Sequence, residues 1–173
     1  MKELILGGAR SGKSALAERL ARESCLAVSY IATATAGDGE MSERIAHHQA
    51  RRPAAWRVVE EPIHLAAALC ANAALDRCLI VDCLTLWLNN LLATGDENLF
   101  HREREVLLQT LLTLPGRMLL VSNEVGLGIV PLGELSRRFR DEAGRLHQDL
   151  ARTCDRVVFV AAGLPLVLKG SPL

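Results

Sequence analysis

The sequence is poor in aromatic residues and carries no net charge. Phe, Trp and Tyr make up only 3% of its 173 residues, so it shows no base-stacking platform of the kind that single-stranded nucleic-acid-binding proteins use. Twenty basic residues balance twenty acidic ones, so no overall positive field attracts nucleic acid or an anionic membrane. We therefore expect neither as the main partner, which leaves small anions bound at local sites.

The sequence also lacks a long apolar run, a secretion signal and paired cysteines. Asp82, Asn89 and Asn90 interrupt the longest apolar segment, whereas a membrane span needs roughly 20 apolar residues. The chain enters an apolar strand pattern at once, without the charged region, apolar core and cleavage site of a signal peptide. Its five cysteines include no Cys-x-x-Cys pair and suit neither a disulfide scaffold nor a zinc site. We expect a soluble, cytoplasmic protein with no membrane span.

Residues 4–14 read Leu-Ile-Leu-Gly-Gly-Ala-Arg-Ser-Gly-Lys-Ser, and the rest of the chain is interpreted around them. They fit the pattern Gly-x-x-x-x-Gly-Lys-Ser/Thr of a phosphate-binding loop, with an apolar strand before it and a helical pattern after it. Glycines let successive backbone N–H groups wrap a phosphate, Lys13 would reach the outer phosphates, and the hydroxyl of Ser14 would bind Mg²⁺. The nucleotide-binding residues predicted here are Gly7, Gly8, Ala9, Arg10, Ser11, Gly12, Lys13 and Ser14.

A second motif is typical of the metal side of such a site. Residues 78–82 read Cys-Leu-Ile-Val-Asp, an apolar strand that ends in a carboxylate. In proteins with a phosphate-binding loop, an acid at this place holds Mg²⁺, often through water. An apolar strand ending in Asp is common by chance, but its pairing with the phosphate loop favours the functional interpretation. Asp82 is therefore the second predicted metal-binding residue, beside Ser14.

Apolar segments with strand and helix periodicity alternate along the whole chain. Half of the residues are hydrophobic, enough for one sizeable core, so residues 1–173 are expected to form a single domain. The expected class is α/β, a mostly parallel sheet with helices on both faces and the phosphate loop at its carboxyl edge. Strands are expected at about 27–32, 56–60, 78–82, 117–122, 155–161 and 166–169, and helices at about 13–23, 40–52, 63–73, 84–92, 97–114 and 132–151.

Two adjacent histidines lie in the predicted helix at 40–52. A helical wheel places His48 on the more apolar face with Met41 and Ile45, and places His47 on the charged face with Arg51. Taken alone, this pair is a buried imidazole beside a solvated one. The small, flexible stretch at 33–39 leaves a strand end, where open α/β sheets bind ligands, and is expected to line the nucleotide site.

Two further segments admit a functional and a plain interpretation. The stretch 123–131 contains two glycines and a proline, which suggests a shaped binding loop, although a simple connector would also explain it. The last long helix carries a dense set of charges between Arg137 and Arg145, and most of these are expected to be solvated.

Taken together, several motifs closely resemble one family, the bifunctional adenosylcobinamide kinase / adenosylcobinamide-phosphate guanylyltransferase of cobalamin biosynthesis. The likeness covers nearly the whole chain, and its order and spacing make it specific. It is carried by Gly-Gly-Ala-Arg-Ser-Gly-Lys-Ser at 7–14, Tyr-Ile-Ala-Thr-Ala at 30–34, the run from Glu40 through the His-His pair to Trp56, Asn-Glu-Val-Gly at 123–126, Gly-Ile-Val-Pro at 128–131, Arg-Phe-Arg-Asp at 138–141 with Gly144, and residues 163–169.

The resemblance implies a P-loop fold, a homotrimer, Mg²⁺ as cofactor, and two reactions. Such an enzyme phosphorylates adenosylcobinamide with a nucleoside triphosphate, ATP or GTP, and then transfers GMP from GTP onto that phosphate through a GMP-histidine intermediate. The family's nucleophile matches His47, which the helical wheel also places outward, and Lys13 is the other catalytic residue. The resemblance further implies that the nucleotide contacts residues 7–14 and Thr33, Ala34, Thr35, His48, Gln49, Ala50, Arg51, Glu60 and Asp82.

One departure and two competing interpretations accompany this hypothesis. The family often has glutamate where this chain has Asp82, and the shorter side chain would favour a water-mediated contact. A simple small-molecule P-loop kinase, with His47 only a surface residue, is the alternative enzyme. A GTP-dependent switch is disfavoured because the chain has no Asn-Lys-x-Asp motif, and its only Asp-x-x-Gly lies within a predicted helix.

Overall fold

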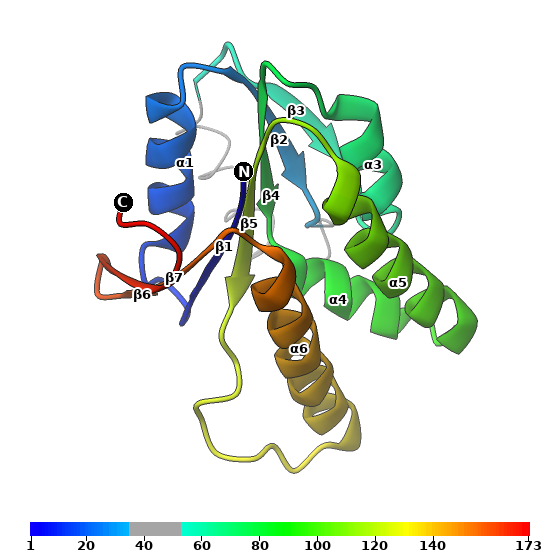
Figure 1. Ribbon diagram of the computed structural model, residues 1–173. Helices are drawn as coiled ribbons and strands as arrows, with labels where there is room; N and C mark the ends of the chain where they lie inside the picture. Colours follow the sequence, from blue (N-terminus) through cyan, green and yellow to red (C-terminus); the bar gives the residue numbers. More distant parts are fainter. Residues whose placement is uncertain (35–52) are drawn as a thin grey trace.

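The computed structural model describes residues 1–34 and 53–173 of the chain (Figure 1). The predicted helix at 40–52, with both adjacent histidines, lies outside this described part. The strands are β1 (Lys2–Gly7), β2 (Ala27–Ala32), β3 (Arg57–Glu60), β4 (Arg77–Asp82), β5 (Arg117–Asn123), β6 (Arg156–Ala161) and β7 (Leu164–Lys169). The helices are α1 (Lys13–Glu23), α3 (Leu65–Asn72), α4 (Leu84–Ala93), α5 (Glu97–Thr113) and α6 (Glu134–Thr153).

The strands described form one sheet in the order β3-β2-β4-β5-β1-β6-β7. Every neighbouring pair is parallel except β6 with β7, which is an antiparallel hairpin at the edge. The turn of that hairpin has left-handed backbone at Ala162 and Gly163. The prediction of a mostly parallel sheet is confirmed, and the last strand begins at Leu164, two residues before its expected start.

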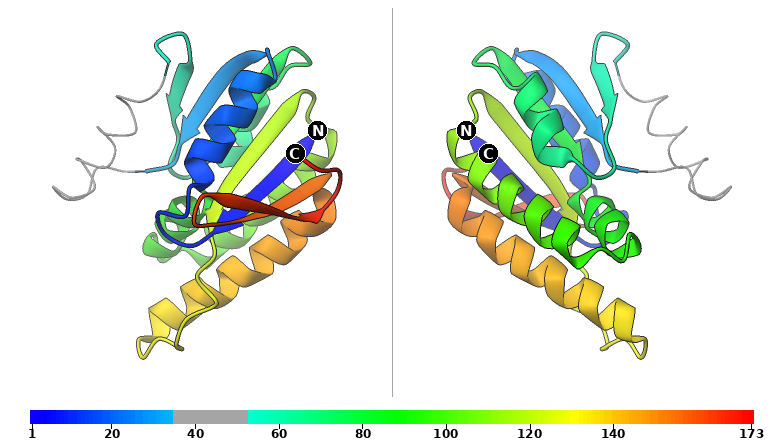
Figure 2. Two further views of the ribbon diagram at one scale, coloured as in Figure 1. Left: turned by 90° about the vertical axis from the view of Figure 1, so that its left-hand side faces the viewer. Right: turned by 90° about the vertical axis from the view of Figure 1, so that its right-hand side faces the viewer.

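Helices cover both faces of the sheet, as predicted (Figure 1). Successive residues of β1 alternate between two cores because side chains of a strand point to opposite faces. Leu4 and Leu6 pack in the core under α3, α4, α5 and α6, whereas Ile5 packs in the core under α1. Figure 2 shows α1 on one side of the sheet and the longer helices on the other. In the described part, no helix has both the length and the apolar character to cross a membrane.

The carboxyl edge of the sheet gathers the ends of three adjacent strands. Because β5 lies between β1 and β4, its last residues fall between the phosphate loop and Asp82. Gly7 of β1 is opposite Asn123 of β5, and Asp82 of β4 is opposite Val121 of the same strand. Since all three strands are parallel, the residues that follow them meet at one edge, where open α/β sheets bind ligands.

The opposite, amino edge holds a buried ion cluster. Glu3 of β1 is completely buried, and its two carboxylate oxygens accept hydrogen bonds from the Nε atoms of Arg117 and Arg156, each at 2.7 Å. The two arginines begin the strands on either side of β1. A carboxylate is tolerated inside the sheet because both of its oxygens have charged donors.

Candidate active site

The phosphate loop, residues 7–14, turns tightly against the end of β6 and the β6–β7 turn. Gly7 has φ of 153°, and a Cβ atom there would lie 2.3 Å from the carbonyl oxygen of Val160. Gly12 has φ of 101°, and its Cβ would lie 3.2 Å from Cα of Gly163. The N–H of Gly163 donates to the carbonyl oxygen of Ser11 at 2.8 Å. These two glycines are required by close backbone approach as well as by their backbone angles.

Lys13 begins α1 and lies folded back over the loop. Its ammonium group donates to the carbonyl oxygen of Gly8 at 2.5 Å and lies 3.4 Å from the hydroxyl of Ser11. Burial lowers the pKa of Lys13, and the nearby acidic groups of Cys83 and Asp82 oppose this shift. The first turn of α1 contains no acidic side chain, so its positive end has no internal anion to compensate it. The loop, Lys13 and the helix terminus together form a site for phosphate groups.

Asp82 ends β4 and is held by a neighbouring strand. The hydroxyl of Tyr30 in β2 donates to its Oδ2 atom at 2.6 Å. Asp82 is opposite Val121 of β5, and Asn123 of the same strand is opposite Gly7, so Asp82 and the phosphate loop lie at the same edge of the sheet. Ser14 and Asp82 offer a hydroxyl and a carboxylate oxygen, and Mg²⁺ is commonly bound by such hard donors together with substrate phosphates. The two residues therefore offer the type of oxygen ligand that the predicted Mg²⁺ requires.

Thr33 has a structural environment that spacing along the chain did not indicate. It is completely buried, and its hydroxyl donates to the carbonyl oxygen of Cys83 at 2.7 Å and accepts from the N–H of Cys83 at 3.0 Å. The side chain of Asn90 donates to the carbonyl oxygen of Thr33 at 2.8 Å. Thr33 thus ties the end of β2 to the start of α4, and its hydroxyl does not face the surface. Ala34, which follows, is half-buried.

The remaining predicted nucleotide contacts lie apart from the loop or outside the described residues. Glu60 is exposed at the end of β3, the edge strand, and β2, β4 and β5 lie between that strand and β1. The structure therefore brings the phosphate loop and Asp82 together but does not bring Glu60 beside the loop. The predicted residues that lie outside the described part are Thr35, His47, His48, Gln49, Ala50 and Arg51.

Glu124, which the sequence indicated only as part of a loop and of a family motif and not as a site residue, lies beside the phosphate loop. Its backbone N–H donates to the carbonyl oxygen of Gly7 at 2.9 Å. One carboxylate oxygen accepts a hydrogen bond from the N–H of Gly126 at 2.6 Å, and the other lies 3.6 Å from Nδ1 of His147. The position of β5 beside β1 brings Glu124 here, and the linear sequence carries no signal for strand order.

His147 of α6 lies behind Glu124 and was also missed. It is buried, and its Nε2 lies 2.8 Å from the hydroxyl oxygen of Ser122. The hydroxyls of Ser122 and Thr85 are 3.1 Å apart, and the N–H of Asn123 donates to the hydroxyl oxygen of Thr85 at 2.6 Å. Burial lowers the pKa of His147, and the carboxylate of Glu124 acts in the opposite sense. The imidazole therefore tends to be neutral near pH 7.

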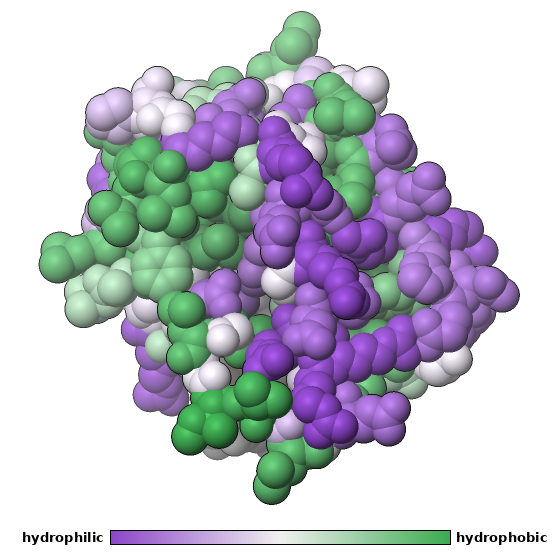
Figure 3. Space-filling view, turned by 60° about the horizontal axis from the view of Figure 1, so that its bottom comes forward, coloured by the Kyte–Doolittle hydropathy of each residue, from purple (hydrophilic) through white to green (hydrophobic). Residues whose placement is uncertain are grey.

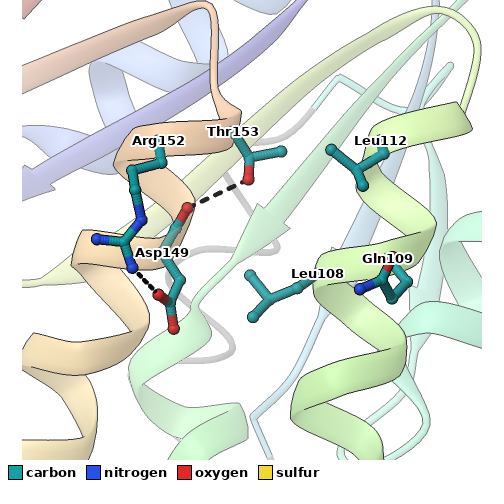
Figure 4. Close-up of a pocket in the computed structure, with 6 residues that line it drawn as sticks. All are labelled: Leu108, Gln109, Leu112, Asp149, Arg152 and Thr153. Carbon is teal, nitrogen blue, oxygen red and sulfur yellow. Dashed lines mark hydrogen bonds and ion pairs between the residues drawn. The ribbon is translucent and has the colours of Figure 1, made fainter.

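A separate hollow of about 260 Å³ lies between α5 and α6 (Figure 4). It is near the end of α6 that precedes β6, at the opposite edge of the sheet from the phosphate loop. Its one cationic lining residue, Arg152, is paired with Asp149. The hollow is therefore separate from the nucleotide site described above. Its lining residues are Leu108, Gln109, Leu112, Asp149, Arg152 and Thr153.

Comparison with solved structures places this geometry in a known class of fold. The chain is similar to the RadB recombinase, with a TM-score of 0.54, 16% identity, and coverage of 91% of this chain and 73% of that one. It is also similar to an ATPase of a bacterial type III secretion system, with a TM-score of 0.55, 13% identity, and coverage of 96% and 56%. At such identities the likeness concerns the fold, a P-loop NTPase-type sheet, as predicted.

Comparison of the sequence is more specific. The chain is 68% identical over 173 residues to the bifunctional adenosylcobalamin biosynthesis protein CobP of Pseudomonas aeruginosa, with all of both chains covered. It is 41% identical to the bifunctional adenosylcobalamin biosynthesis protein CobU of Salmonella typhimurium, over 98% of this chain and all of that one. Residues 3–168 match the family described as cobinamide kinase / cobinamide phosphate guanyltransferase. By these matches the chain belongs to this family, as its motifs predicted.

Proposed function

We propose that this protein phosphorylates adenosylcobinamide with ATP or GTP and then transfers GMP from GTP to adenosylcobinamide phosphate. The products of the second reaction are adenosylcobinamide-GDP and pyrophosphate. The observation that carries the proposal is the match to the family over residues 3–168. The structure supports it, because the phosphate loop and Asp82 lie at the same edge of the sheet. We also propose the cytoplasm as its location, where both nucleotides are available.

Both reactions use one triphosphate site but different phosphorus atoms. In the first, the substrate hydroxyl attacks the γ-phosphorus, and the nucleoside diphosphate leaves with the electron pair of the broken P–O bond. In the second, a nitrogen of His47 attacks the α-phosphorus of GTP as pyrophosphate leaves, and the substrate phosphate then takes the GMP group from the histidine. Lys13 and the backbone N–H groups of the phosphate loop stabilise the charge that builds on the phosphate oxygens.

Ser14 and Asp82 are the residues that would hold Mg²⁺. When bound, this ion neutralises charge on the triphosphate. Thr33 and Asn90 would act indirectly, because their hydrogen bonds fix the chain that leads from β2 toward the predicted nucleotide contacts at 34–35.

We further propose that the protein assembles as a homotrimer. Large apolar side chains are exposed around the β5–α6 loop, among them Leu127, Ile129 and Leu132, which are 82%, 98% and 97% exposed. Leu164, Leu166 and other hydrophobic residues of the edge strand β7 are exposed as well. Figure 3 shows hydrophobic residues gathered on one side of the face it presents. Apolar surface of this kind is typical of protein–protein contacts, and measurement of the molar mass by light scattering tests the proposal.

The guanylyl-transfer half is tested by covalent labelling. Incubation with GTP labelled at the α-phosphorus should give an acid-labile, base-stable nucleotidyl adduct, as expected of a phosphorus–nitrogen bond. His47→Ala should abolish the label while keeping phosphorylation of adenosylcobinamide measurable. His101→Ala, at an exposed histidine of α5, is the matched control and should label like the unaltered protein. Label retained in His47→Ala would refute the role of that histidine, and no label in any protein would favour the monofunctional kinase.

A further inference from the structure

Glu124 occupies a place at the sheet edge where a group could act on the attacking substrate. It follows β5, which lies between the strand of the phosphate loop and the strand of Asp82. Its backbone is hydrogen-bonded to Gly7, the first residue of the loop, at 2.9 Å. Because this bond uses the main chain, the position of residue 124 beside the loop is set independently of its side chain. The side chain of Glu124 is 23% exposed and can therefore be reached by a ligand.

A chain of buried polar groups leads from the protein interior to this carboxylate. The hydroxyl oxygen of Thr85 accepts from the N–H of Asn123 and lies 3.1 Å from the hydroxyl oxygen of Ser122, to which it can donate. Ser122 in turn can donate to Nε2 of His147 at 2.8 Å, which leaves the proton of a neutral imidazole on Nδ1. The reverse direction would aim an Nδ1 lone pair at a carboxylate and is disfavoured by electrostatic repulsion.

The last member of this series of polar groups is His147, whose Nδ1 atom faces the carboxylate of Glu124. Nδ1 of His147 is buried and has no hydrogen-bond partner among the described residues. Oε2 of Glu124 lies 3.6 Å away, slightly too far for a direct bond. A buried N–H without a partner is costly, so a small movement that closes this gap is favourable. His147 is therefore placed to orient the carboxylate of Glu124 and to stabilise its charge.

We propose that Glu124 accepts the proton of the attacking hydroxyl in the phosphoryl-transfer step, and that His147 is the positioning residue that holds Glu124 for this task. The inference rests on the proposed function. The hydroxyl oxygen forms its bond to the γ-phosphorus while its proton passes to a carboxylate oxygen of Glu124. The bond from the γ-phosphorus to the bridging oxygen breaks, and the diphosphate carries away its electron pair. A carboxylate at such a site is a usual general base in phosphoryl transfer.

Thr85, Ser122, His147 and Glu124 differ in their exposure to solvent, and this difference distinguishes their roles. Thr85, Ser122 and His147 are 7%, 2% and 6% exposed, so none of them is open to a bulky substrate. Glu124 alone among the four is partly exposed, with 23% of its side chain accessible. The three buried groups can therefore act on the reaction only through Glu124.

The decisive experiment measures the two reactions separately in a Glu124→Gln variant. Glutamine keeps the shape of the side chain and an oxygen that can accept from Gly126, but it cannot accept the proton. The kcat for phosphorylation of adenosylcobinamide should fall by ~100-fold or more, with the KM for the nucleotide little changed. The rate of GMP transfer to pre-formed adenosylcobinamide phosphate should fall by a factor at least ten times smaller, because this reaction starts from a phosphate and not from a hydroxyl.

A double-mutant cycle tests the role of His147. His147→Ala should lower the kcat for phosphorylation by roughly 10-fold, as is typical when a partner that orients a functional group is removed. In a Glu124→Gln background the same change should have almost no further effect, because it acts through Glu124. His147→Gln, which keeps an N–H donor, should recover part of the rate, and His101→Ala should match the unaltered protein.

The outcomes distinguish this inference from the function on which it rests. If the unaltered protein performs neither reaction, the proposed function is wrong. If it performs both and Glu124→Gln phosphorylates at the normal rate, the function stands and the assignment of Glu124 is wrong. Equal loss of both reactions in Glu124→Gln would also overturn the assignment, since that pattern indicates general damage to the phosphate loop. If the losses in kcat of the two single variants add in the double variant, His147 does not act through Glu124 and has only a structural role.

Discussion

The ammonium group of Lys13 donates a hydrogen bond to the carbonyl oxygen of Gly8, 2.5 Å away and five residues earlier in the same loop. Lys13 is only 6% exposed, and burial lowers its pKa. A carbonyl oxygen of the loop thus occupies the ammonium group that a triphosphate would bind. A nucleotide phosphate can replace the carbonyl oxygen because an anion is the stronger partner for an ammonium group.

Lys13→Ala should therefore impair catalysis without impairing the fold. We expect the kcat for phosphorylation to fall by ~100-fold or more, because removal of one group that stabilises transition-state charge has this size of effect. The melting temperature should stay the same or rise, since the change removes a buried charge whose protonated form burial already disfavours. Steady-state kinetics and thermal unfolding measure the two quantities. A large drop in melting temperature would mean that Lys13 supports the fold and would contradict this interpretation.

Gly7 and Gly8 are neighbours with opposite tolerance for a side chain. A Cβ at Gly7 would meet the carbonyl oxygen of Val160 at 2.3 Å and the hydroxyl oxygen of Ser11 at 2.7 Å, whereas a Cβ at Gly8 meets nothing within 4 Å. Gly7→Ala should lower the free energy of unfolding by about 2 kcal/mol, the usual cost of a steric clash in a packed region. Gly8→Ala should change it by less than about 0.5 kcal/mol. Urea unfolding compares the two, and equal effects would argue against the close packing of the loop on β6.

Sequence reasoning could locate the phosphate loop and Asp82 because each is a local pattern. A glycine-rich turn between a strand and a helix, and an acid at a strand end, are recognisable within about ten residues. The mostly parallel sheet followed from the alternation of strands and helices. Strand order is a property of the whole fold, so the place of β5 between β1 and β4 was not visible, nor was the contact of Glu124 with Gly7.

Side-chain environments were harder to predict than element positions. Thr33 was expected among the nucleotide contacts, but its hydroxyl bonds to the backbone of Cys83, 50 residues further along the chain. His147 lies in a helix rich in charged residues, and its polar partner in the interior is Ser122 from β5. Glu3 interrupts an apolar strand, and its burial is explained only by arginines from β5 and β6. Polar residues of this kind are satisfied by partners that are distant in sequence, so local patterns cannot reveal them.

The buried cluster around Glu3 gives a prediction about stability. Glu3→Gln would leave the guanidinium groups of Arg117 and Arg156 without their common counter-charge. Breaking a buried ion pair from one side typically costs about 3 kcal/mol, because an uncompensated charge stays in the interior. Glu23→Gln is the control, since its pair with Arg19 is at the surface and should contribute less than about 1 kcal/mol. Chemical unfolding measures the free energy of unfolding of both variants, and similar losses would show that the ion cluster contributes little to stability.

The cysteines provide a test of the fold that requires no substrate. Burial raises the pKa of Cys78 and Cys83 to about 11 and that of Cys154 to about 12, whereas Cys25 and Cys70 are exposed. Only the thiolate reacts with a disulfide reagent, and its fraction rises with pH up to the pKa, so at about pH 8 the three buried thiols stay protonated as well as shielded. Two of the five thiols should therefore react quickly in the folded protein.

All five thiols should react once guanidinium chloride unfolds the chain, and a variant with serine at both exposed positions, Cys25 and Cys70, should lose the fast phase. Cys83 is the informative thiol, because it follows Asp82 and its backbone holds Thr33. If a third thiol reacted quickly and peptide mapping identified it as Cys83, the start of α4 would be open to solvent. The hydrogen bonds that join β2 to α4 would then not persist in solution, and the indirect role proposed for Thr33 would fail with them.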